Sequence, residues 1–203
     1  MKNKTHAPFS GYCLGLWMAV ALSTSSVAVP NLVQNGSFES GDVGWGWTYN
    51  FGIAYGFPGA AAGGNFAEVY GTIYQTLATT PGQTYDVRFA LAGNFNIASL
   101  TTADIVWGNQ DLGTVSWNPS GHNVNNFGWI WADFHVTAIS SSTLFTIANP
   151  YVGDGSGRIA RVDAVSVTAV PDASSTAVLL GFGVLGILGT RPFLKLSKIK
   201  RNG

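Results

Sequence analysis

Short stretches of alternating apolar and polar residues recur through the middle of the chain, separated by turn-forming residues. In the clearest stretch, residues 84–92, apolar side chains at Tyr85, Val87, Phe89 and Leu91 alternate with other residues. A period of two is typical of a strand with one buried face. Similar stretches are residues 31–39, 65–77, 100–107, 112–117, 127–138, 143–148 and 159–169. About eight strands at this spacing, without a helix-length amphipathic pattern, predict an all-β fold, specifically a jelly-roll β-sandwich.

The first 28 residues differ from this body. They begin with two lysines, continue with a 12-residue apolar run at residues 11–22, and end with Ser26 and Ala28 at the −3 and −1 positions of a cleavage site. This layout predicts an N-terminal signal peptide over residues 1–28. The single cysteine, Cys13, lies within it. The mature chain is therefore expected to form no disulfide and to use no thiol chemistry.

The C-terminal residues have the layout of a sorting signal. Val170-Pro171-Asp172 precede 18 uncharged residues at 173–190, and a basic tail follows. As a helix, this apolar run is about 27 Å long, close to the thickness of a membrane core. Residues 170–203 resemble the VPDSG-type PEP-CTERM signals, which an exosortase processes in Gram-negative bacteria.

That resemblance implies an exported protein that a single transmembrane helix anchors transiently, before it reaches the cell surface or the extracellular space. The sequence departs from the pattern at Ala173 and Ser174 and in its lysine-rich tail. A plain C-terminal membrane anchor is the alternative interpretation.

The charge of the body excludes one class of partner. Nine acidic residues and only three basic ones, Arg88, Arg158 and Arg161, lie between Val29 and Val170. Proteins that bind nucleic acid need a basic surface. We therefore expect no nucleic-acid partner.

Several short motifs occur in an order that resembles a known family. They are residues 31–39 (NLVQNGSFE), Trp45, 74–77 (YQTL), 81–85 (PGQTY), 134–138 (FHVTA) and 162–167 (VDAVSV). This order is similar to the galactose-binding-like jelly rolls of the carbohydrate-binding module 4/9 type and of the DUF642 proteins. The resemblance implies one jelly-roll domain over residues 29–169.

The resemblance also implies a structural calcium ion near the first and last strands. Glu39 and Asp163 match the acidic positions of the opening and closing motifs, although Ala164 stands where the family has a second acid. Calcium needs six to eight oxygen ligands, so backbone carbonyls and water would have to complete the shell. Alternatively, the two carboxylates bond neighbouring backbone amides or pair with Arg161.

Aromatic residues provide the main indication of function. The stretch at residues 127–138 has a core face of Ile130, Ala132, Phe134, Val136 and Ala138, and an opposite face of Phe127, Trp129, Trp131, Asp133 and His135. Rigid aromatic surfaces beside polar groups suit sugars, which need stacking and hydrogen bonding together. Trp45 and Trp47 lie in a glycine-rich stretch, where we expect exposed contact residues. The alternative is that these aromatic side chains pack in the interior.

Enzyme signatures are absent from the sequence. There is no GxSxG motif, and the mature chain has only two histidines, His122 and His135. We therefore expect a non-catalytic surface or extracellular-matrix protein that binds a glycan or an exopolysaccharide. A matrix or adhesion protein without sugar binding is one alternative, and an unrecognised hydrolase is another.

Overall fold

The computed structural model describes residues 28–41, 46–48 and 50–171. Trp45, the apolar run at 173–190 and all of the predicted signal peptide except Ala28 lie outside the described residues. Within these ranges, no helix has the length and apolar character that crossing a membrane requires.

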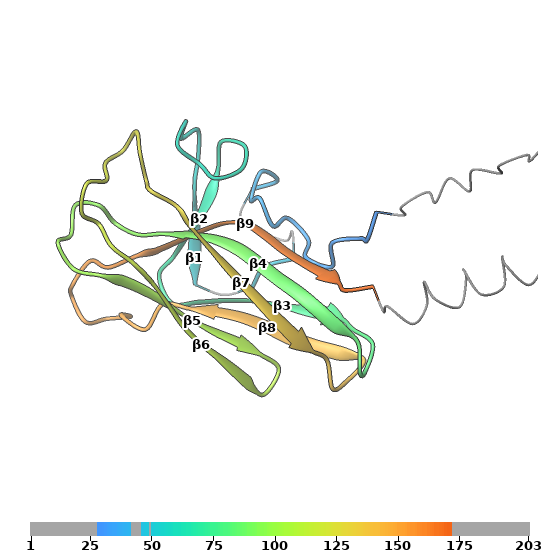
Figure 1. Ribbon diagram of the computed structural model, residues 1–203. Helices are drawn as coiled ribbons and strands as arrows, with labels where there is room; N and C mark the ends of the chain where they lie inside the picture. Colours follow the sequence, from blue (N-terminus) through green and yellow to red (C-terminus); the bar gives the residue numbers. More distant parts are fainter. Residues whose placement is uncertain (1–27, 42–45, 49, 172–203) are drawn as a thin grey trace, which may run out of the picture.

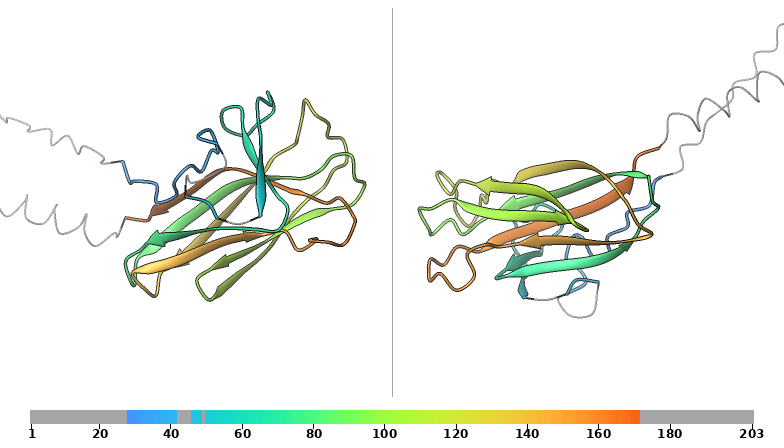
Figure 2. Two further views of the ribbon diagram at one scale, coloured as in Figure 1. Left: turned by 180° about the vertical axis from the view of Figure 1, so that it is seen from behind. Right: turned by 90° about the horizontal axis from the view of Figure 1, so that it is seen from below.

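The described residues form an all-β sandwich of two antiparallel sheets, which confirms the predicted fold class at this level (Figures 1 and 2). Nine strands occur in these residues: β1 (Phe51–Ala54), β2 (Phe66–Val69), β3 (Thr72–Ala78), β4 (Thr84–Ala92), β5 (Thr101–Trp107), β6 (Gln110–Trp117), β7 (Ile130–Thr137), β8 (Ser142–Ala148) and β9 (Ala160–Ala169). The five-stranded sheet has the order β1-β2-β9-β4-β7, and the four-stranded sheet has the order β3-β8-β5-β6.

The core lies between the two sheets and follows the alternation in the sequence. Tyr85, Val87, Phe89 and Leu91 of β4 are all buried. The ring of Tyr85 lies 5.8 Å from that of Trp107 in the opposite sheet. Each apolar side chain of this size contributes about 1.5–3 kcal/mol when it is fully buried. The polar positions of the same strands therefore face outward.

Two of the predicted strands differ in the structure. The stretch at residues 65–77 divides into β2 and β3, which belong to different sheets. The break is at Tyr70 and Gly71, whose amides both donate to the carbonyl of Asn50. The stretch at residues 31–39 forms no strand, but Asn31 makes an isolated bridge with Thr168. Short range alternation does not show where a chain changes sheets.

The start of the described chain runs beside β9. The Leu32 amide donates to the carbonyl of Val167, and the Val165 amide donates to the carbonyl of Gly36. A Cβ atom at Gly36 would lie 2.0 Å from the Val165 oxygen, so this approach requires glycine. The first and last described residues consequently leave the sandwich at the same end (Figure 1).

Candidate functional site

A groove lies on the outer face of the five-stranded sheet, across β9, β4 and β7. Its volume is about 470 Å³. Six polar residues line it: Asp86, Arg88, Asp133, His135, Ser166 and Thr168. Because side chains alternate along a strand, these residues share the face opposite the core. The sheet therefore displays a polar surface on a rigid support.

The strand register arranges these polar residues in two rows. Asp86 in β4 lies opposite His135 in β7 and Thr168 in β9. Arg88, two residues further along β4, lies opposite Asp133 and Ser166. Directly opposed side chains on adjacent antiparallel strands are close enough to interact. Each row accordingly combines a carboxylate, a hydroxyl group and a nitrogen-containing side chain, which is the His135 imidazole in one row and the Arg88 guanidinium in the other.

Two polar pairs hold the groove in this arrangement. The Nδ1 atom of His135 forms a hydrogen bond with the Oδ1 atom of Asp86. The Nε atom of Arg88 lies 3.2 Å from the Oδ1 atom of Asp133. All four side chains are substantially exposed, so these pairs contribute little to stability. Their main effect is on the direction of the polar atoms.

Trp131 lies on the same sheet face, one row beyond the residues that line the groove. It lies opposite Ala90 of β4, and 47% of its surface is exposed. The guanidinium carbon of Arg88 lies 4.2 Å from the centre of its ring, a distance that permits a cation–π interaction. An exposed indole ring therefore adjoins the carboxylates, which is the combination expected of a sugar-binding surface.

The sequence left open whether the aromatic residues at 129–135 lie on an exposed binding surface or pack in the interior, and the structure shows one of each kind. The outward direction of Trp131, Asp133 and His135 agrees with the alternation in the sequence. Trp129 precedes the strand, and its Nε1 atom donates to the carbonyl of Gly59 at 2.6 Å. Its ring also packs 5.5 Å from the ring of Phe66. Trp129 therefore packs against residues near Gly59 and Phe66 and does not face the open groove.

The expectation of an exposed Trp47 requires a correction. This side chain is only 6% exposed and stacks on Phe38, with ring centres 5.7 Å apart. Its Nε1 atom donates to the carbonyl of Asn35. Trp47 therefore offers no open face to a ligand.

Four of the groove residues were not identified as site residues from the sequence. Asp86 and Arg88 form the polar face of β4, and Ser166 and Thr168 form that of β9. Alternation alone indicates that they face outward. It does not indicate that β4 lies between β7 and β9, because that order depends on long-range pairing.

The predicted metal ligands Glu39 and Asp163 lie in a separate cluster. Asp163 is fully buried, and its two oxygens accept hydrogen bonds from the amides of Ala62 and Ala164. Glu39 Oε1 accepts from the amides of Gly64 and Asn65. These bonds agree with one part of the alternative to a calcium site, namely that the two carboxylates bond backbone amides. The other part of that alternative, pairing with Arg161, is wrong because Arg161 bonds Glu68 instead.

Burial changes the ionisation of this cluster. It raises the pKa of Asp163 to about 6, whereas the amides of Ala62 and Ala164 act in the opposite direction. The nearby Glu39 carboxylate also raises this pKa. Two acids thus lie close enough to interact, as the metal prediction requires, but amide donors already bond their oxygens. In the described part of the chain, no group of three or more His, Cys, Asp and Glu side chains could hold a metal ion.

Backbone conformation is unusual around the same cluster. Asn35, Phe38 and Ala164 are the non-glycine residues with positive φ among the described residues. Ala164 lies where the pairing of β9 with β4 shifts register. A Cβ atom at Gly63 would lie 2.4 Å from Glu39 Oε1. Such conformations cost free energy and concentrate where surrounding contacts impose them.

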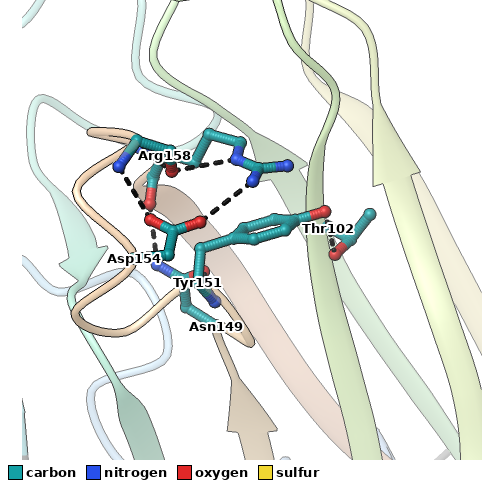
Figure 3. A network of polar contacts seen from close by, with 6 residues as sticks. Thr102, Asn149, Tyr151, Asp154 and Arg158 are labelled. Carbon is teal, nitrogen blue, oxygen red and sulfur yellow. Dashed lines mark hydrogen bonds and ion pairs between the residues drawn. The ribbon is translucent and has the colours of Figure 1, made fainter.

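Loop 149–159 is held by its own network of polar contacts (Figure 3). Asp154 accepts hydrogen bonds from the Ser156 amide and from the Arg158 guanidinium. That guanidinium lies 3.5 Å from the ring centre of Tyr151, whose hydroxyl accepts a hydrogen bond from Thr102. The bonds from Ser156 lower the pKa of Asp154. The Asp154 carboxylate therefore stabilises the conformation of the loop through bonds to Ser156 and Arg158.

The groove also contains a histidine bonded to a carboxylate, an arrangement that occurs in hydrolases. In a catalytic triad, the imidazole needs its second nitrogen against a nucleophile. The hydroxyl-bearing residues, Ser166 and Thr168, lie on β9, on the far side of β4 from His135. The arrangement suits hydrogen bonding to an extended ligand better than acyl transfer.

The end of the described chain belongs to a known sequence motif. Residues 169–191 match the VPDSG-CTERM motif. This match confirms the VPDSG-type signal predicted from Val170, Pro171 and Asp172. The motif indicates an exported protein with a C-terminal sorting signal.

One curated protein shares sequence similarity with most of the chain. It is the multifunctional-autoprocessing repeats-in-toxin of Vibrio cholerae serotype O1, with 27% identity over 170 residues. The match covers 79% of this chain and 4% of the toxin. The chain therefore corresponds to only about 4% of the length of that relative.

Solved carbohydrate-binding modules with a jelly-roll fold have similar structures. The CBM22-1 xylan-binding domain of Xyn10C from Paenibacillus barcinonensis has a TM-score of 0.53 and 12% identity, and the match covers 73% of this chain and all of that domain. A family 16 carbohydrate-binding module has a TM-score of 0.48 and 15% identity, with coverage of 68% and 99%. The similarity to the xylan-binding domain supports the fold assignment.

Proposed function

We propose that residues 29–169 form a single non-catalytic domain that binds a glycan or exopolysaccharide in the groove on the outer face of the five-stranded sheet. The observation that carries this proposal is the exposed Trp131 ring beside the two polar rows of the groove. Aromatic stacking and hydrogen bonding are then available on one rigid surface. The xylan-binding domain with a similar fold supports the assignment.

Affinity electrophoresis of the 29–170 fragment through gels that contain soluble polysaccharides tests this function. We expect retardation by at least one polysaccharide, and Trp131→Ala should reduce it about tenfold or more, as loss of a central aromatic contact does. Leu144→Ala is the matched control, because Leu144 is similarly exposed but lies on the other sheet. Equal retardation of both variants, or none of the wild type, would contradict the proposal.

Sorting is the second part of the proposed function. Cleavage after Ala28 and handling of the VPDSG-CTERM region by an exosortase would place the domain at the surface or in the matrix of a Gram-negative bacterium. The motif at residues 169–191 supports this route. Mass spectrometry of the exported protein should find Val29 at the N-terminus and a C-terminus upstream of residue 203. An intact chain in the cytosol would contradict it.

Calcium at Glu39 and Asp163 stays a prediction. The closeness of the two carboxylates supports it, and the amide donors on the same oxygens oppose it. A ligand that binds only the folded state raises the melting temperature, so about 5 mM calcium chloride against a chelator provides the test. A rise that Glu39→Gln abolishes would support calcium, and an unchanged melting temperature would exclude it.

A structural role in the matrix is the second candidate function. The outer face of the four-stranded sheet presents Thr76, Leu144 and Thr146, with Asp104 and Asp111 as the charged residues of its strands on that side. A surface with so little charge has little electrostatic barrier to self-association. Sedimentation of the 29–170 fragment distinguishes the candidates, since a matrix protein should form oligomers at micromolar concentration without any glycan.

A further inference from the structure

The cation in the groove is already neutralised by its neighbours. Arg88 is the only lysine or arginine among the residues that line the groove. Its guanidinium lies against the Asp133 carboxylate on one side and over the Trp131 ring on the other. An acidic group on a ligand would have to compete with both contacts. Arg88 is therefore poorly placed to attract a polyanion.

The carboxylates of the groove have unused acceptor capacity. Asp86 and Asp133 each use Oδ1 for the partner on the neighbouring strand. Among the residues that the structure describes, no hydrogen-bond donor reaches the Oδ2 atom of either. A carboxylate oxygen accepts hydrogen bonds from hydroxyl groups but repels other carboxylates and sulfates. The groove thus favours ligands that donate hydrogen bonds and carry no negative charge.

The net negative charge of the whole domain also disfavours the binding of acidic polymers. Between Val29 and Val170 there are nine acidic residues, three arginines and no lysine. Two of these arginines, Arg158 and Arg161, form ion pairs with Asp154 and Glu68. A negative surface slows the approach of a polyanion at low ionic strength. Among the residues that the structure describes, neither the groove nor the rest of the sandwich therefore offers an unpaired lysine or arginine to an acidic polymer.

We propose that the groove selects uncharged polysaccharides, whose hydroxyl groups donate to Asp86 and Asp133, and excludes carboxylated and sulfated ones. This inference rests on the proposed glycan-binding function and specifies the class of glycan. Arg88 acts as a positioning residue that orients Asp133 and covers part of the indole surface.

Matched pairs of polymers that differ mainly in charge provide the test. Suitable pairs are hydroxyethylcellulose with carboxymethylcellulose, methyl-esterified with de-esterified homogalacturonan, and arabinoxylan with glucuronoxylan. For any pair that the fragment binds, we expect the dissociation constant of the acidic member to be at least about tenfold higher at low salt. Binding to the neutral member should change less than about twofold between about 50 and 500 mM sodium chloride.

Charge-neutralising variants test the origin of the discrimination. Asp86→Asn with Asp133→Asn should narrow the difference between the neutral and acidic members at least about threefold, because it removes the repelling charges. Asp104→Asn, on the other sheet, is the control for removal of an acidic charge outside the groove and should leave the difference intact.

The outcomes separate this inference from the proposed function. Tighter binding to an acidic member, weakened by salt, would overturn the inference while the glycan-binding function stands. An equal loss of discrimination in the Asp104→Asn control would also overturn it. Retention of no polysaccharide would overturn the function and the inference together.

Discussion

Trp47 and Trp131 show that the same residue type performs different tasks in this sandwich. Trp47 packs against Phe38 and Phe145 in the interior, and Trp131 lies on the open sheet face. Removing a buried tryptophan loses burial and leaves a cavity. Removing an exposed one loses mainly surface contacts.

The expected effects on stability follow from that difference. Trp47→Ala should lower the free energy of unfolding by about 3–5 kcal/mol. Trp131→Ala should lower it by less than about 1 kcal/mol, so its effect on binding can be measured in folded protein. Urea denaturation of the two variants provides the measurement. Similar losses in both would show that Trp131 is a packing residue.

Asp163 gives the stability a specific pH dependence. Its pKa in the folded state is about 6, whereas the unfolded value is about 3.9. Folding therefore favours the protonated form, and this stabilising contribution is complete at low pH and is lost as the pH rises through 6. In the presence of a chelator, the melting temperature of the wild type should accordingly rise as the pH falls from 7 to 5.

The variant Asp163→Asn isolates this group. Its melting temperature should vary less over the same pH range, because the amide does not titrate. Asp104→Asn, at a partly exposed acid on the other sheet, serves as the control and should retain the wild-type dependence. An unchanged slope in Asp163→Asn would assign the pH dependence to other groups.

At the scale of elements, Arg161 links β9 to its neighbours. Its Nε and Nη2 atoms each lie 3.0 Å from Glu68 Oε1 on β2, and its Nη1 donates to the Gly93 carbonyl. The guanidinium also lies between 5.1 and 5.7 Å from the ring centres of Phe66, Phe95 and Phe127. With only 11% of its side chain exposed, it functions as an internal tie.

Arg161→Ala should be strongly destabilising. It leaves Glu68 without its cationic partner in a mostly buried site, which costs about 3–5 kcal/mol in comparable cases. Arg161→Lys should recover only part of the loss, since a lysine cannot make the same directed bonds and stacking. Thermal or urea unfolding measures both effects. Arg158→Ala, in loop 149–159, should cost less than about 1 kcal/mol and is the control.

Strands with a regular local alternation were predicted correctly, whereas elements that depend on distant residues were not. The bounds of Thr84–Ala92 agree with the sequence because its alternation is regular and one face is buried. Phe51–Ala54 was not predicted, since all four residues are only partly buried and show no alternation. The turn between β2 and β3 was missed because Asn50, about twenty residues earlier, provides its bonding partner. The local pattern therefore predicts regular strands, but it does not predict turns and short strands whose hydrogen-bond partners lie far away in the sequence.

At the scale of the whole molecule, the groove depends on the order of strands. β4, β7 and β9 are far apart in sequence but adjacent in the sheet, and together they supply the groove residues. The sequence identified Trp131, Asp133 and His135 because they share one strand face. Asp86 and Ser166 join them only through the pairing of three strands.

We propose that this outer sheet face is the surface that contacts a glycan. The most direct measurement is an NMR titration of the isotope-labelled 29–170 fragment with an oligosaccharide of a polysaccharide that retards it. We expect the largest chemical-shift changes at Asp86, Arg88, Trp131 and His135. Changes confined to loop 149–159 or to the outer face of the four-stranded sheet would contradict it.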